Sequence, residues 1–427
     1  MEKLQKFYQN SIKKVLNKLT ESFRDKSNVN KIVDICALMF FSLAFLSIPL
    51  CSFKVGLNKI TWIFSILFLV LMAVSIILDG IITIDKISIS LILFVIWIII
   101  CLIVNINLHS KIVITPIFLS IVTFIIYTYL SRNKKYRNMY FNSLLYSLTI
   151  FMIVYIMTYY KELISLNFTR LGDKFGNIND IAISFGIGFS VCFSFILHSK
   201  FNILRFLILF ALLFLFGFCG LSTGSKIFVL IITASMIFSI FVFMRTKKLK
   251  WYWYIISALI VFLVAIVVLN LPAFETMKER IFMFLNLKSK DKSTDIRFTM
   301  FVDGIYMFLR RPLFGFGISG FFSSSSFGNC WSHNNFSELL CSYGMIGFIL
   351  FYIPYILVIK NIINGKSNKL NDFSSVIMIV FICCMFSVAL ESQKVFAYSI
   401  AIFYSLYESE QIELLNINKL KSKKNTK

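Results

Sequence analysis

The feature that most constrains the fold is the recurrence of apolar stretches about 20 residues long. A helix of about 20 residues crosses the hydrocarbon core of a bilayer, which is about 30 Å thick. Only 15% of the 427 residues are charged, and the mean hydropathy is +0.83, whereas soluble domains carry roughly 25% charged residues. The sequence therefore predicts an all-α, polytopic integral membrane protein and excludes an ordinary soluble domain.

We expect twelve of these stretches to span the membrane. They are residues 31–50, 58–78, 87–106, 111–130, 139–160, 179–197, 202–220, 226–244, 251–271, 339–359, 373–390 and 396–410. Because successive spans pack into one helical unit, we predict a single membrane domain over residues 31–413. Residues 1–30 precede it, with apolar side chains at helical spacing among lysines, as is typical of an amphipathic helix on the inner leaflet. A basic tail, residues 414–427, follows it.

The positions of lysine and arginine predict how the spans are oriented. With twelve spans, the basic loops at 132–137, 245–250 and 360–369 lie on the same side as both ends of the chain. Since basic loops are retained in the cytoplasm, we expect both termini to be cytoplasmic. Most of the net charge of +23 is then explained by topology and by attraction to membrane lipids. Its dispersal among short loops argues against binding to nucleic acid.

Two loops on the predicted outer side are longer than a turn requires. They are residues 161–178 and residues 272–338, and the second, a large extracytoplasmic loop, is of the kind that usually carries function. Arginines alternate there with apolar residues, so we expect short amphipathic helices that rest on the membrane. The segment RRPLFGFGISGFF, residues 310–322, then breaks a helix at Pro312 and supplies glycines for a tight turn.

Three polar stretches are predicted to converge at the outer mouth of the spans. They are RLGDKFGNIND (170–180), LSTGSK (221–226) and WSHNNFSELL (331–340). Taken singly, each has an ordinary explanation, because Arg170 can anchor a span, Lys226 can extend to the headgroups and His333 can cap a helix. Their joint occurrence at one face favours a functional site.

The cysteines and histidines indicate neither a disulfide framework nor a metal site. His109, His198 and His333 are scattered, no CxxC pair occurs, and no acidic pair lies on an outer loop where a transferase would hold a divalent cation. We therefore expect no metal and no cofactor.

The polar stretches resemble those of the O-antigen ligase and O-antigen/capsular polysaccharide polymerase (Wzy-like) superfamily. The similarity covers about residues 170–351, through RLGDKFGNINDIA, LSTGSKIFVLIITAS, DIRFTMFVDGIYMFLRRPLFGFG and SHNNFSELLCSYGMIGFILF. In that family a histidine and an asparagine, followed by an apolar run and G-x-x-G, end the large outer loop; here they are His333, Asn334, Leu339, Leu340, Gly344 and Gly347. Two family arginines fall on Arg170 and Lys226, and the lysine keeps the charge but loses the planar fork that grips phosphate.

The resemblance implies transfer of a sugar chain from a polyprenyl-pyrophosphate carrier at the outer leaflet of the cytoplasmic (inner) membrane of a bacterium. His333 would act as general base on the acceptor hydroxyl. Arg170, Lys226 and Arg297 would stabilise the pyrophosphate leaving group in place of a metal. The residues expected to bind the substrate are Asn177, Ser222, Ser225, Arg310, Arg311, Asn334 and Glu338.

Three functions remain open at this point. The first is a polymerase that moves a growing chain onto the next lipid-linked repeat, and the second is a ligase that moves a finished chain onto another acceptor. The third is a flippase or other transporter, a class that tends to show ionisable residues at the bilayer midplane and paired repeats. The expected partners are a lipid-linked donor and acceptor, membrane lipids, and other assembly proteins such as a flippase and a chain-length regulator.

Overall fold

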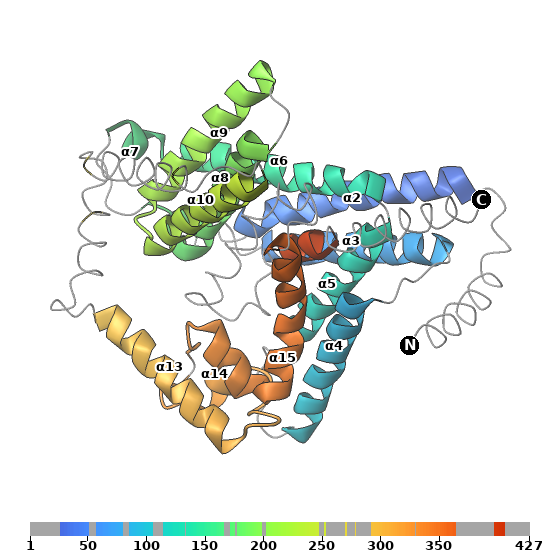
Figure 1. Ribbon diagram of the computed structural model, residues 1–427, viewed down its shortest axis with the longest axis vertical. Coiled ribbons are helices and arrows are strands. Elements are labelled where there is room, and N and C mark those ends of the chain that lie inside the picture. Colours follow the sequence, from blue (N-terminus) through green and yellow to red (C-terminus); the bar gives the residue numbers. More distant parts are fainter. Residues whose placement is uncertain are drawn as a thin grey trace.

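The computed structural model is helical throughout the part of the chain that it describes (Figure 1). That part comprises residues 26–50, 57–79, 85–105, 114–132, 134–165, 171–175, 177–198, 202–246, 252, 270, 278, 292–328, 330–363 and 397–405. These residues contain no β-strand, which confirms the predicted all-α class. Outside them lie residues 1–25, Arg170, the tail 414–427 and most of the segment 272–291.

Nine long helices in the described residues coincide with predicted spans. They are α2 (Lys26–Leu50), α3 (Leu57–Asp79), α4 (Lys86–Val104), α5 (Ile114–Arg132), α6 (Lys134–Thr158), α8 (Ile178–His198), α9 (Ile203–Ser222), α10 (Lys226–Thr246) and α15 (Asn335–Ile363). Six of them, α3, α4, α8, α9, α10 and α15, are long and apolar enough to cross a membrane, and α2, α5 and α6 contain shorter apolar segments. The predicted spans 251–271 and 373–390 lie outside the described residues, and 396–410 is described only at 397–405, which is helical. The total of twelve stays a prediction.

Further helices occupy the two segments that we expect on the outer side. The helix α7 (Tyr160–Ser165) and the 3₁₀ helix η3 (Asp173–Phe175) lie in the first segment, and α13 (Lys292–Arg310) and α14 (Gly320–Ser324) lie in the second. In α13 the buried residues Met300, Gly304 and Met307 recur every three to four positions, which is the spacing of one helical face. The side of the membrane on which these helices lie stays a prediction.

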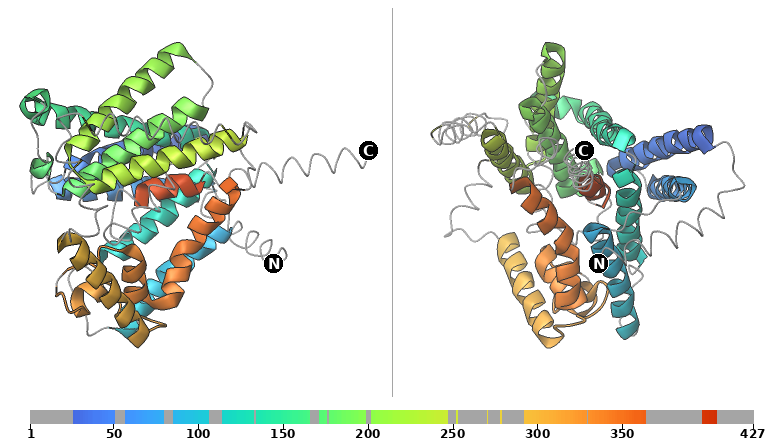
Figure 2. Two further views of the ribbon diagram at one scale, coloured as in Figure 1. Left: turned by 60° about the vertical axis from the view of Figure 1, so that its left-hand side comes forward. Right: turned by 45° about the vertical axis from the view of Figure 1, so that its right-hand side comes forward.

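The helices divide into groups that pack around different partners. Helix α2 packs against α3 and α6, α8 packs against α9 and α10, and α15 packs against α4 and α13. Figures 1 and 2 show α8, α9 and α10 toward one end of the molecule, and α13, α14 and the beginning of α15 toward the other. This arrangement determines which of the candidate residues can meet.

A buried carboxylate joins the helices α2, α3 and α5. Asp34 of α2 is 6% exposed, and its Oδ1 accepts hydrogen bonds from Ser75 Oγ of α3 at 2.8 Å and from Tyr129 OH of α5 at 2.9 Å. A buried polar group lowers stability unless it is hydrogen-bonded. The two donors therefore make Asp34 a specific link between these helices.

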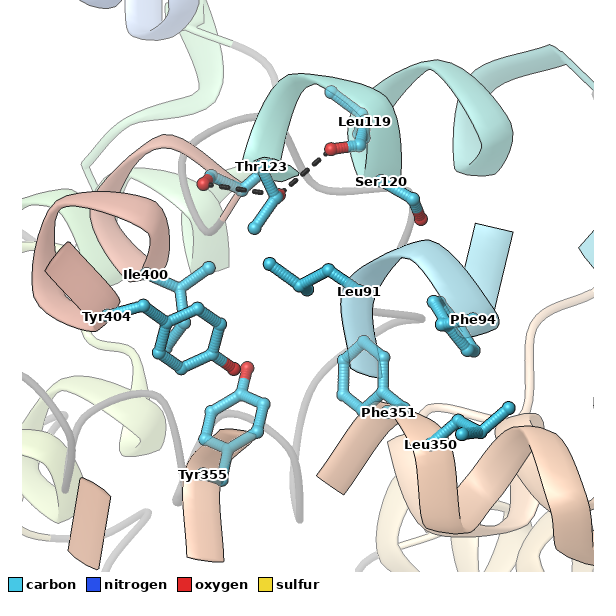
Figure 3. A pocket seen from close by; sticks show the side chains of 11 residues that line it. Leu91, Phe94, Leu119, Ser120, Thr123, Leu350, Phe351, Tyr355, Ile400 and Tyr404 are labelled. Atoms are coloured by element: carbon cyan, nitrogen blue, oxygen red, sulfur yellow. Dashed lines mark hydrogen bonds between the residues drawn. The ribbon is translucent and has the colours of Figure 1, made fainter. Parts of the chain in front are cut away.

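A small apolar cavity lies where α4, α5 and α15 meet the segment 397–405, as Figure 3 shows. Most of the side chains that line it are apolar, and the side chains of Tyr355 and Tyr404 point toward one another there. Thr123 Oγ1 donates to Leu119 O at 2.9 Å. None of the candidate polar residues lines this cavity, so it belongs to helix packing.

Candidate functional site

The candidate base His333 lies in the loop that ends where α15 begins. Asn334 caps this helix, because its Oδ1 accepts the N–H groups of Phe336 at 3.0 Å and of Ser337 at 3.2 Å. An asparagine in this position satisfies donors that the first helical turn leaves unpaired. The cap is thus Asn334, and the capping explanation for His333 is wrong.

The backbone at His333 is held in the left-handed region, with φ 52°. For a residue other than glycine this conformation costs about 1–3 kcal/mol and persists only where the surroundings impose it. Hydrogen bonds constrain the residues on both sides, since Ser332 Oγ donates to Asn334 O at 2.9 Å and Ser332 N donates to Glu338 Oε2 at 3.0 Å. The loop therefore presents a half-buried imidazole in a defined position.

Arg297 of α13 is the charged residue that acts on this imidazole. Burial lowers the pKa of His333 below its ordinary value, and the positive charge of Arg297 lowers the pKa further. The side chain of Arg297 is itself exposed. The structure therefore places together two of the residues singled out in the sequence, with His333 favoured in its neutral form.

The approach of α13 to α15 explains why Arg297 reaches this loop. Gly304 lies two turns after Arg297 on the buried face of α13, and a Cβ added there would lie 2.9 Å from Ser337 Cβ. On either side of Gly304 along α13, Met300 and Met307 pack with Phe321 of α14 and Cys341 of α15 in a small separate core. Only a glycine at residue 304 permits this separation of the two helices.

Helix α15 is interrupted at Gly344, where φ is 67° and ψ is −170°. A side chain at this position would meet the carbonyl group of Leu313, so the break depends on glycine for both conformation and space. The part of α15 before the break, Asn335 to Tyr343, contacts α13 and α14. The longer part after it packs with α4.

The backbone groups released by this break bind the segment that follows α13. Met345 N donates to Pro312 O at 2.8 Å rather than to the carbonyl one turn earlier. Three carbonyl oxygens accept from outside the helix: Cys341 O from Phe316 N at 2.8 Å, Ser342 O from Gly317 N at 2.9 Å and Tyr343 O from Trp97 Nε1 at 2.8 Å. All these groups are satisfied, as buried backbone requires, and the predicted turn after Pro312 is thereby fixed against α15.

The paired arginines at the end of α13 have different surroundings. Arg311 Nη1 donates to Asn105 Oδ1 at 2.8 Å, and its guanidinium lies 4.7 Å from the ring of Phe316. Arg310 is exposed in the last helical turn. Arg311 therefore links the loop to the end of α4, and Arg310 presents its charge at the surface.

A second cluster joins the loop before α8 to the turn between α9 and α10. Leu171 N donates to Ser222 O at 3.0 Å, and Ser225 Oγ donates to Asn179 Oδ1 at 2.8 Å. Ser222 is completely buried, and its hydroxyl lies 2.9 Å from the hydroxyl of Tyr155. These bonds bring two of the three polar stretches together, as the sequence predicted.

The groups of this second cluster that reach solvent are Asn177, which is exposed, and Lys226. Asn177 precedes α8, and its Oδ1 accepts Asn179 N at 3.0 Å. Lys226 is half-buried and is the first residue of α10. Its ammonium adds to the positive end of the helix macrodipole, which is an arrangement that attracts anions.

Several residues that shape the site were not identified from the sequence. Ser332 and Gly304 act through the contacts given above, and Tyr159 forms a further contact beside η3. Its hydroxyl donates to Asp173 Oδ1 at 2.7 Å, which lowers the pKa of Asp173. The S-x-N pattern ahead of α15 was the available signal for Ser332; Gly304 gives no local signal.

The candidate residues thus form two clusters. One contains Arg297, His333, Asn334 and Glu338 on α13 and α15, and the other contains Asn177, Ser222, Ser225 and Lys226 around α8, α9 and α10. Figure 1 shows α8, α9 and α10 above α13, with the beginning of α13 turned toward them. Convergence of all three stretches stays a prediction, as does the role of Arg170, which lies outside the described residues.

Within the described ranges, no group of three or more histidine, cysteine, aspartate or glutamate side chains is placed to hold a metal ion. Positive charge near His333 is supplied by Arg297. The arrangement can thus combine a neutral imidazole with a guanidinium at the entrance of a membrane helix, which suits proton removal beside a negatively charged group.

Comparison with known proteins gives a family for the part of the chain that holds most of these residues. No curated protein matches the chain. The family model described as O-antigen ligase matches residues 209–352, from within α9 to the middle of α15. The match includes Lys226, Arg297 and His333, and its family fits a multi-pass inner-membrane enzyme of glycan processing. The match to residues 209–352 confirms the resemblance that the sequence motifs indicated.

Proposed function

We propose that this protein is a glycan polymerase that transfers a growing oligosaccharide from its polyprenyl-pyrophosphate carrier to the next lipid-linked repeat. The acceptor hydroxyl oxygen bonds to the anomeric carbon of the donor, and the bond from that carbon to the phosphate oxygen breaks. The hydroxyl proton passes to His333, and polyprenyl pyrophosphate leaves. The observation that carries the proposal is the pairing of a half-buried His333 with Arg297 at the start of α15.

The environment of His333 suits it to the role of base. Burial and the charge of Arg297 both lower its pKa, so the imidazole is neutral at physiological pH and can accept a proton. Once it is protonated, the same charge of Arg297 favours release of that proton after the acceptor has reacted. A general base of this kind contributes about 10²–10⁴-fold to a rate.

Positive groups at both clusters support a pyrophosphate leaving group. Arg297 adjoins the base, and Lys226 stands at the positive end of α10. Fixed positive groups stabilise charge as it develops on the leaving oxygen. We propose that Arg297, Lys226 and Arg170 supply this charge without a divalent cation, and that both clusters contact the lipid-linked substrates.

A ligase is the second candidate, because the matched family is described as O-antigen ligase. A ligase and a polymerase share the donor, the leaving group and the base, and they differ in the acceptor. We favour the polymerase, in which the acceptor is also lipid-linked and the same outer-leaflet face serves both substrates.

The test is reconstitution of the purified protein in lipid nanodiscs with a synthetic lipid-linked repeat. A polymerase should yield longer lipid-linked glycans and free polyprenyl pyrophosphate, also in excess EDTA. The variant His333→Ala should bind the lipid nearly normally and turn over at least about a hundredfold more slowly. Wild-type turnover by this variant, or a strict requirement for Mg²⁺ or Mn²⁺, would refute the mechanism.

Cells that lack the protein distinguish the three functions. Loss of a polymerase should lead to single lipid-linked repeats on the outer leaflet, and loss of a ligase should lead to full-length lipid-linked chains. Loss of a flippase should leave repeats on the inner leaflet.

A further inference from the structure

Glu338 is a carboxylate in an unusual place, one turn inside α15 and without solvent contact. It is 0% exposed, and such a group is unfavourable in an apolar interior unless hydrogen bonds compensate. Its Oε2 accepts Ser332 N at 3.0 Å, and its Oε1 lies 3.5 Å from Ser342 Oγ. The closer bond is to the backbone of the residue immediately before His333.

The contact to Ser332 bears directly on the backbone of His333. The left-handed conformation of His333, φ 52°, reverses the chain between Ser332 and the cap at Asn334. Ser332 is held twice, through its N–H by Glu338 and through its hydroxyl by Asn334 O at 2.9 Å. Without the bond to Glu338, Ser332 would be held only through its hydroxyl.

We propose that Glu338 is a positioning residue whose Oε2, by accepting the N–H of Ser332, fixes the backbone immediately before His333 and thereby the direction of its imidazole. The proposal rests on the proposed role of His333 as base. It replaces the expectation that Glu338 binds substrate, since a completely buried side chain is not available to one.

The surroundings indicate that Glu338 acts as an acceptor rather than as a charge. The charge that shifts the pKa of His333 is that of Arg297, whereas Glu338 bonds only to backbone and hydroxyl groups in the contacts given above. A glutamine keeps an oxygen at the same distance along the side chain. An aspartate keeps the charge but is one methylene shorter, so it cannot reach Ser332 N without a shift of the helix.

This difference in reach gives a matched pair of variants, Glu338→Gln and Glu338→Asp. Both are purified in nanodiscs, and kcat and KM are measured with a synthetic lipid-linked repeat, together with Tm and membrane abundance. We expect Glu338→Gln to retain most of the wild-type kcat. We expect Glu338→Asp to lose at least about tenfold in kcat with little change in KM, because a displacement of about 1 Å at a reacting group costs up to about a hundredfold.

Three outcomes would overturn the proposal. A loss in Glu338→Gln as large as that in Glu338→Asp would show that an uncharged acceptor of the same reach is not sufficient. Wild-type kcat in Glu338→Asp would show that the bond to Ser332 has no catalytic consequence. A loss in Glu338→Asp that follows a fall in Tm and a rise in KM would show a general structural role. Failure of the proposed function is distinguishable, because His333→Ala would then be active whatever the Glu338 variants do.

Discussion

The contact between Gly304 and Ser337 predicts that a single methyl group can separate the proposed base from its neighbouring cation. Arg297 lies two turns before Gly304 on α13, and His333 lies four residues before Ser337, so the distance between the two helices at this contact affects both. The substitution Gly304→Ala adds only a Cβ. In an exposed helix interior it would raise stability by up to about 1 kcal/mol.

At the contact with α15, however, the added methyl group is expected to be destabilising, and the geometry gives the size of this effect. The added Cβ would lie 2.9 Å from Ser337 Cβ, whereas carbon atoms pack at about 3.5–4.0 Å. Helices α13 and α15 must therefore move apart by roughly 0.5–1 Å, at a cost of about 1–3 kcal/mol for overpacking. Because a misplacement of about 1 Å can reduce turnover about a hundredfold, we expect Gly304→Ala to lose about ten- to a hundredfold in kcat.

The assay is chain extension on a synthetic lipid-linked repeat at equal membrane abundance. The double variant Gly304→Ala, Ser337→Gly removes the facing Cβ. Its kcat should be close to that of Ser337→Gly alone, so that Gly304→Ala causes little further loss in this background. Thr299→Ala, on the exposed side of the same helix, is the matched control and should behave as wild type. Full activity of Gly304→Ala, or a loss that Ser337→Gly does not relieve, would refute the reasoning.

Three further predictions address charge, orientation and stability. Arg297→Ala should raise the pKa of His333, because a positive neighbour lowers it, and so should move the acidic limb of the pH–rate profile of kcat/KM to higher pH; an unmoved limb would contradict the pairing. Cysteines introduced at Lys290 and Lys248 in a cysteine-free background should react with an impermeant reagent in intact cells at 290 and not at 248; the reverse would invert the topology. Asp34→Leu should reduce stability by about 2–6 kcal/mol, since Ser75 and Tyr129 each lose an acceptor worth about 1–3 kcal/mol, whereas an unchanged Tm would show that the network is not stabilising.

The helices could be predicted from the sequence because the signal for each is local. An apolar stretch of about 20 residues specifies a helix by itself, and nine of the predicted spans fall on described helices. The cap of α15 could also be predicted from a local pattern. Ser332 and Asn334 stand just before an apolar run, and this pattern predicts a helix start, yet His333 attracted attention as the ionisable residue between them.

The arrangement around Gly344 could not be predicted, because its cause is not local. The G-x-x-G pattern suggested that Gly344 and Gly347 let the helix pack closely, and at Gly347 this is found, since a Cβ there would lie 3.0 Å from Trp97 Cδ1. At Gly344 the helix is instead broken. Its released carbonyls bind N–H groups of Phe316 and Gly317 and the indole of Trp97, and one of these partners is almost 250 residues away in the sequence.

The lysine at position 226, where the family has an arginine, illustrates how local structure can compensate for a side chain. An arginine supplies both charge and donors in fixed directions, whereas a lysine supplies a point charge. At the start of α10, the positive end of the helix macrodipole adds to the charge of Lys226, so on the proposed function the side chain needs to supply only charge. On the proposed function, Lys226→Arg should retain much of the activity, whereas Lys226→Ala should lose at least about tenfold, or about 1.4 kcal/mol of transition-state stabilisation. Turnover is compared at equal membrane abundance, and an unimpaired Lys226→Ala enzyme would return Lys226 to the role of a helix-end lysine that extends to the headgroups.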